Sequence, residues 1–146
     1  ELTTSADLSV SSFRDALNDI ADTTDDAGKL IHWRASILLV PYENQWLASE
    51  LVDSPDRPDT ANRAINAFKK QDGGGVSVVA WPYLTDADAW FLLASPEKHQ
   101  IRSYWRERPN TMHDWDFESS SMKVKIRARW KRGVSDFRGA YGSPGA

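Results

Sequence analysis

Residues 122–131 restrict the possible folds of this chain more than any other segment. Apolar and basic side chains alternate there over ten residues. The apolar members are Met122, Val124, Ile126, Ala128 and Trp130, and the basic members are Lys123, Lys125, Arg127, Arg129 and Lys131. Because successive side chains of a strand point to opposite faces, this period of two predicts an antiparallel strand with one apolar face and one basic face.

Helical spacing occurs in the first half of the chain. Apolar residues recur three and four positions apart between Val10 and Ile20, after Ser9 as a candidate N-cap, and predict a helix. Residues 42–51 predict a second helix, and residues 62–70 a short helical turn.

Most strand signals come later. Strands are predicted at residues 30–40, 76–81, 89–93, 101–105 and 122–131. Helices that precede strands indicate an α+β fold with a mainly antiparallel sheet, not an alternating parallel one. Trp81, Trp90 and Trp130 lie on these strands and are expected in the core, whereas the glycine-rich residues 139–146 are expected to be hard to fold alone.

Length and composition exclude several classes of protein. A chain of 146 residues suits one domain, and no apolar run approaches the roughly 18 residues of a membrane-spanning helix. The absence of cysteine excludes disulfides, thiolate nucleophiles and Cys-ligated zinc sites.

Candidate catalytic and metal-binding residues are few. His32, His99 and His113 form no spaced pair of the zinc-site type. Residues 113–116 offer one imidazole and two carboxylates, but neighbours on an extended segment point in opposite directions, so a polar loop is the preferred interpretation. No serine lies in a Gly-x-Ser-x-Gly motif, and residues 73–75 lack the lysine of a phosphate-binding loop. We therefore predict no catalytic residue, no cofactor and no metal site, and a hydrolase centred on His113 and Asp116 ranks last.

The five cations of residues 122–131 are the strongest binding signal. They can contact phosphates, pair with acidic side chains of neighbouring strands or subunits, or face water. Residues 1–75 hold 7 basic and 13 acidic side chains (−6), and residues 76–146 hold 11 and 8 (+3). Since the whole chain is acidic, contact with nucleic acid is less favoured than pairing with acidic side chains of neighbouring strands or subunits, or exposure to water.

Several segments resemble, in the same order, stretches of tailed-phage major capsid proteins. Residues 83–93 resemble a Tyr-Leu-Thr-Asp turn before a Trp-bearing strand of that family, and residues 136–142 resemble its C-terminal signature most closely. The other matching segments are residues 9–21, 38–41, 64–66, 106–107 and 125–130. The resemblance covers almost the whole chain and is nearest to Mu-type major head subunits.

This resemblance implies a structural subunit of a bacteriophage or prophage head, with no enzymatic activity and no cofactor. The implied partners are copies of the chain itself, as hexamers and pentamers, in a virion shell around double-stranded DNA. The resemblance also implies a scaffold or protease as a partner during assembly and non-specific contact with packaged DNA. It implies no membrane as a partner, and assembly in the bacterial host cytoplasm.

The family fold further implies a domain organisation. With the N-terminal arm, extended loop and spine helix absent, residues 1–146 are expected to be a C-terminal fragment and a single domain. That domain resembles the family's axial domain, with C-terminal strands that return toward the peripheral domain. The alternative to a capsid subunit is a carbohydrate- or nucleic-acid-binding module that uses exposed tryptophans or the basic strand.

Overall fold

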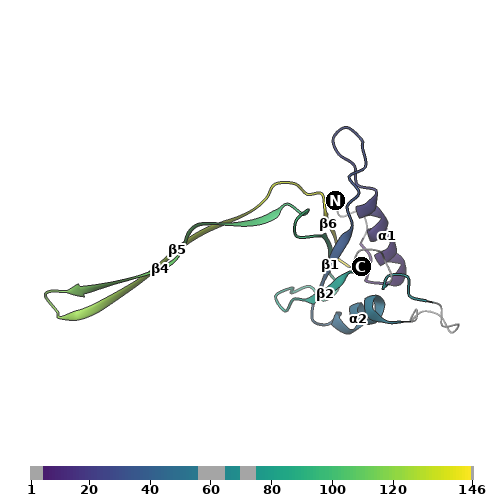
Figure 1. The fold of residues 1–146 in the computed structure, drawn as a ribbon. Helices are drawn as coiled ribbons and strands as arrows, with labels where there is room; N and C mark the ends of the chain where they lie inside the picture. The colour runs from purple at the N-terminus through teal and green to yellow at the C-terminus, as the bar shows by residue number, and fades with distance from the viewer. Residues whose placement is uncertain (1–4, 56–64, 70–74, 146) are drawn as a thin grey trace. The chain divides into compact units, whose positions relative to one another are not determined.

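The computed structural model describes residues 5–55, 65–69 and 75–145, which fall into two compact units. The first, here called the sheet unit, contains Glu1–His99 and Phe137–Ala146. The second, here called the hairpin, contains Gln100–Asp136 and appears as the two-stranded ribbon labelled β4 and β5 (Figure 1).

The first helix of the sheet unit, α1 (Val10–Ala21), begins as predicted at Ser9. The Ser9 hydroxyl accepts a hydrogen bond from the backbone N–H of Ser12 (3.2 Å), and the Ser12 hydroxyl accepts one from the N–H of Ser9 (2.9 Å). This reciprocal capping box satisfies two backbone donors at the helix start. The buried face of α1 presents Phe13 and Ile20 to the core, in agreement with the predicted spacing.

Four strands form one sheet in the order β2-β1-β3-β6. The strands are β1 (Ala35–Val40), β2 (Ser77–Ala80), β3 (Trp90–Ala94) and β6 (Ala140–Ser143). Helix α2 (Gln45–Asp53) lies between β1 and β2, which pair in parallel, whereas β3 pairs antiparallel with both β1 and β6. Two helices with a mainly antiparallel set of strands confirm the predicted α+β class.

The glycine-rich C-terminal residues, expected to be hard to fold alone, contain β6, which pairs with β3. Tyr141 lies opposite Leu92 of β3 and is buried, and its ring lies 5.7 Å from that of Trp90. The Ser143 hydroxyl is also buried and donates to the carbonyl of Ala6 (2.8 Å). Pairing along β3 therefore gives this segment the partners that it lacks by itself.

Trp90 lies at the centre of the core, as predicted. It is fully buried with Phe13 and Leu38, and its indole N–H donates to the carbonyl of Ala6 (3.0 Å). The same expectation for Trp81 is wrong: Trp81 follows the edge strand β2, and its exposed ring packs edge-on against Tyr83.

The helical turn predicted at residues 62–70 lies partly outside the described residues. Of its members, residues 65–69 are described and form a turn rather than a helix. Asn66 is buried there, and its amide donates to the carbonyls of Leu51 (2.9 Å) and Ser54 (3.1 Å) at the end of α2. These bonds satisfy carbonyls that the helix terminus leaves without partners.

The hairpin consists of β4 (Ile101–Asp116) and β5 (Ser121–Val134), paired antiparallel. Strand β5 confirms the predicted strand at residues 122–131. The strand predicted at residues 101–105 continues to Asp116, so the polar loop expected at residues 113–116 is wrong. Pro109 lies where the pairing shifts between Glu107 and Asn110, a position that tolerates a residue without an N–H.

Candidate functional site

The pairing register sorts the side chains of the hairpin into two faces. Residues directly opposite each other on antiparallel strands share a face. All five basic residues singled out in the sequence lie on one face, here called the charged face. Its cross-strand pairs are Lys123 with Asp114, Lys125 with Met112, Arg127 with Asn110, Arg129 with Glu107 and Lys131 with Tyr104.

Two of these five cations have ion-pair partners within the hairpin. Lys123 Nζ lies 2.7 Å from Asp116 Oδ2, and Arg127 Nε lies 3.0 Å from Glu107 Oε2. Across residues 5–55, 65–69 and 75–145, no ion pair involves Lys125, Arg129 or Lys131. Three exposed positive charges therefore remain for a partner outside this network.

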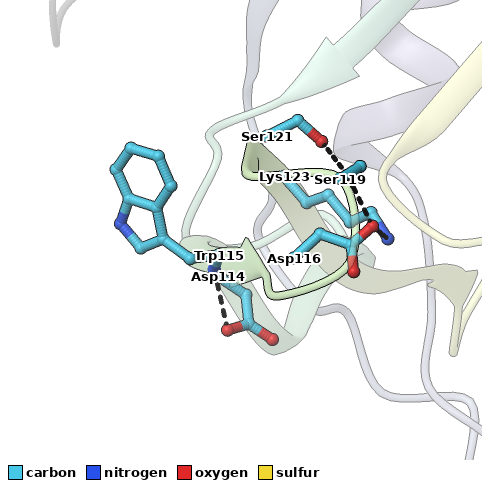
Figure 2. A network of polar contacts seen from close by, with 6 residues as sticks. All are labelled: Asp114, Trp115, Asp116, Ser119, Ser121 and Lys123. Carbon is cyan, nitrogen blue, oxygen red and sulfur yellow. Dashed lines mark hydrogen bonds and ion pairs between the residues drawn. The ribbon is translucent and has the colours of Figure 1, made fainter.

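A polar network holds the turn that joins the two strands. Asp116 Oδ2 accepts hydrogen bonds from Lys123 Nζ and from the Ser119 hydroxyl (2.8 Å), and the Ser119 and Ser121 hydroxyls lie 2.6 Å apart. Asp114 Oδ1 accepts from the backbone N–H of Trp115 (2.9 Å). Figure 2 shows the Trp115 ring on the opposite side of the strand from this network. The turn thus has a defined conformation without a hydrophobic core.

The network leads to a testable prediction about the pKa of Asp116. The hydrogen bond from Lys123, followed by that from Ser119, lowers the pKa of Asp116 below its ordinary value. A depressed carboxyl pKa favours the folded turn fully above the unfolded pKa of Asp, about 3.9, and this contribution is lost as the pH falls through the lowered folded pKa. We expect Lys123→Met to raise the pKa of Asp116, measured by NMR titration of the side-chain carboxyl carbon.

Lys125→Met is the matched control for this titration, since Lys125 lies on the same face without bonding Asp116. We expect it to change the pKa of Asp116 much less than Lys123→Met does. Equal changes in the two variants would mean that overall charge, and not the Lys123 hydrogen bond, sets the pKa.

The other face of the hairpin, here called the apolar face, is exposed. Its apolar members are Ile101, Trp105, Trp115, Met122, Val124, Ile126, Ala128, Trp130 and Val134. Trp115 is 71% exposed and Ile126 70%, and the rings of Trp105 and Trp130 lie 5.7 Å apart. The core position expected for Trp130 is therefore wrong, because a two-stranded sheet offers this ring only its cross-strand neighbour.

Sequence reasoning missed the aromatic residues at the far end of this face. Trp115 precedes Asp116, and Phe117, the first residue of the turn, is 99% exposed. The signal in the sequence was the alternation of Thr111, His113 and Trp115. This alternation covers few residues, and two shifts in strand pairing precede it, so it does not continue the pattern of residues 101–105.

The structure does not bring the candidate metal or hydrolase residues together. His113 lies opposite Val124 on the apolar face, whereas Asp114 and Asp116 lie on the charged face. Within the described part of the chain, no three His, Cys, Asp or Glu side chains form a metal-binding group. His32 is exposed before β1 with a φ of 55°, and not inside a strand as the sequence suggests.

Comparisons with known proteins give one result. The profile of a family described as "Phage capsid protein" matches residues 1–143. No curated protein and no solved structure gives a significant match. Among the residues that the structure describes, no helix combines the length and the apolar character needed to cross a membrane.

Proposed function

The chain belongs to the phage capsid protein family, and from this premise we propose that the head it helps to build encloses double-stranded DNA. Membership makes the chain a structural subunit of a phage head, which assembles with copies of itself into the virion shell. The match over residues 1–143 is the observation that carries this function. The family is a structural protein type, and we further propose that the chain has no enzymatic activity.

The finer proposal is that the chain is the axial domain of a Mu-type subunit and assembles through hexamers and pentamers. The resemblance of residues 83–93 and 136–142 supports it, because these two segments include most of the neighbouring strands β3 and β6. In this proposal residues 1–146 form one capsid domain with C-terminal strands directed toward the peripheral domain. Assembly takes place in the host cytoplasm, with a scaffold or protease as transient partners.

The charged face is proposed as a contact between neighbouring subunits. The hairpin holds nine Lys and Arg against five Asp and Glu, a formal charge of +4. The remaining residues hold nine against 16, a formal charge of −7. Opposite charges on two parts of one chain favour contact between the hairpin of one copy and the rest of another. Non-specific contact with packaged DNA is the competing use of this face.

Electron microscopy tests the proposed function directly. The full polypeptide that carries this sequence is expressed alone and with its scaffold, and is examined by negative staining. We expect closed shells or rings of capsomers. Monodisperse particles that never assemble would contradict the capsid function and would favour the binding module, to be followed by glycan and DNA titrations.

Charge reversal tests the charged face. We expect Lys125→Glu, Arg129→Glu and Lys131→Glu together to lower the yield of shells by about tenfold or more, because each reversal replaces attraction by like-charge repulsion. These three positions spare both ion pairs of the hairpin. Shells are counted by microscopy after sedimentation.

The matched control keeps the charge at the same positions, with Lys125→Arg, Arg129→Lys and Lys131→Arg. It should assemble as the parent does. Unchanged assembly of the Glu variant would exclude a subunit contact at this face. If the Glu variant assembles but loses salt-dependent DNA binding, the face contacts DNA instead.

A further inference from the structure

The apolar face of the hairpin requires a cover. Soluble monomers rarely expose a large contiguous apolar patch, and an isolated two-stranded hairpin is marginally stable in water. Here exposed apolar side chains run along the ribbon from Trp130 to Met122, with the half-buried Ala128 among them, and Phe117 follows at the turn. Such a row is typical of a surface that is buried in a complex.

Charge selects the kind of partner. Two hairpins packed together would bring two formal charges of +4 into contact, whereas the sheet unit, at −7, has the complementary sign. A shell supplies the sheet units of neighbouring copies at high local concentration, so this argument rests on the proposed function. The favoured partner is therefore a second copy of this chain, through its sheet unit.

The sheet unit has a groove of suitable size and chemistry. Its volume is about 280 Å³, and its walls include Tyr83, Leu84, Ala89, Phe91 and Pro144. Aromatic and aliphatic walls suit one inserted aromatic side chain, which is a common anchor of protein interfaces. Tyr83 lines the groove, is 80% exposed and packs edge-on against Trp81, so its ring offers an aromatic surface to an inserted group.

The groove also carries an acidic side chain that matches the hairpin. Asp86 lines it, and its carboxylate accepts a hydrogen bond from the backbone N–H of Asp88 (3.2 Å). On the hairpin, Lys125 has no ion-pair partner among the described residues, but it lies on the charged face and not on the apolar face. The carboxylate of Asp86 therefore adds negative charge to the sheet unit beside the groove, and the net positive charge of the hairpin is complementary to it.

The turn of the hairpin is ordered before any partner binds. Asp116, the last residue of β4, bonds Lys123 of β5 and Ser119 of the turn (Figure 2). Phe117 follows Asp116 in the chain. A preordered turn loses less conformational entropy on binding than a mobile loop. Side-chain bonds therefore hold the turn that carries the exposed Phe117, which suits an anchor residue.

We propose that Phe117, at the turn of the hairpin of one copy, inserts into the groove between Tyr83, Phe91 and Pro144 of a neighbouring copy. The apolar face of the hairpin then lies against the sheet unit of that copy. Insertion buries Phe117 and covers the apolar row in one contact.

Site-specific photo-crosslinking tests this proposal. Benzoylphenylalanine replaces Phe117 in the full polypeptide, and isotopically labelled and unlabelled copies are mixed before irradiation. We expect crosslinks between copies that map to residues 83–91 or to Pro144. The matched probe replaces Tyr104, an exposed aromatic residue on the charged face, and should not label the groove.

Each crosslinking result has a defined meaning. Crosslinks confined to one copy, between two hairpins, or to another part of the sheet unit would overturn the proposal. The measurement is made on assembled shells and on concentrated unassembled protein. If shells form without crosslinks to the groove, only the proposed docking is overturned. If the groove is crosslinked but no shells form, only the capsid function is contradicted. If neither shells nor groove crosslinks are found, both proposals are contradicted.

Substitutions provide a second test. Phe117→Ser should raise the protein concentration needed for assembly by about tenfold or more, as expected for loss of an interface anchor. Phe117→Leu keeps an apolar side chain and should restore most of the assembly. Tyr83→Ser, at an exposed position, should weaken assembly in the same direction, and its effect should not add to that of Phe117→Ser. Independent, additive effects would overturn the pairing of these two residues.

Discussion

Trp90→Ala is expected to lower the free energy of unfolding of the sheet unit by about 3–5 kcal/mol, the usual cost of truncating a buried aromatic residue to alanine. Trp90, the first residue of β3, is fully buried in the same core cluster as Phe13 and Leu92, and its ring packs against Tyr141. Its removal leaves a cavity and also removes the hydrogen bond to the carbonyl of Ala6. Urea unfolding followed by far-ultraviolet circular dichroism measures the change.

Two further variants separate packing from hydrogen bonding. Trp90→Phe retains much of the ring but leaves the Ala6 carbonyl with one donor fewer, at an expected cost of about 1–3 kcal/mol. Trp115→Ala removes an exposed indole on the hairpin and should change the stability of the sheet unit by about 0.5 kcal/mol or less. If Trp90→Ala were no more harmful than Trp115→Ala, the core described here would be wrong.

Gly139→Ala is the second substitution with a large expected effect, a loss of about 2–5 kcal/mol of unfolding free energy when the two costs below are combined. Gly139 has a φ of +83°, where a residue with a Cβ loses about 1–2 kcal/mol. An added Cβ would also lie 2.9 Å from Cζ3 of Trp33, a contact that requires the ring to shift. Overpacking of this kind costs about 1–3 kcal/mol.

Gly28→Ala is the matched control for Gly139→Ala. Gly28 has a similar φ of +78°, but an added Cβ there meets nothing within 4 Å. It should therefore show the backbone cost alone, about 1–2 kcal/mol. The difference between the two variants, measured in the same urea titrations, gives the cost of the contact with Trp33. Equal losses would mean that the Trp33 ring moves aside freely.

Local sequence signals predicted the parts of the fold that depend on local chemistry. Ser9 marked the start of α1, because a capping hydroxyl acts within three residues of itself. The alternation at residues 122–131 predicted β5 and both of its faces. The length of β4 was underestimated because Pro109 usually ends a strand, whereas here it lies at a pairing shift that only the partner strand creates.

The sequence did not predict whether another layer of the structure covers a given strand face. Trp90 and Trp130 both lie on strands that the sequence predicts, yet one is fully buried and the other is exposed. The period of a strand states which side chains share a face, but not whether another layer packs on it. The alternation along β5 therefore identified the five cations from the sequence. Phe117 lies in the turn, outside that alternation, and was not identified.

The hairpin is an insertion between two neighbouring strands of the sheet. Strand β3 ends at Ala94 and β6 begins at Ala140, and the N–H of Ala94 bonds the carbonyl of Gly139 (2.8 Å). The chain therefore leaves and re-enters the sheet at almost the same place. Two residues added to each arm would lengthen the ribbon by about 6.6–6.8 Å and keep every side chain on its face. Evolution can thus adjust the span of this arm in small steps without redesigning the sheet that carries it.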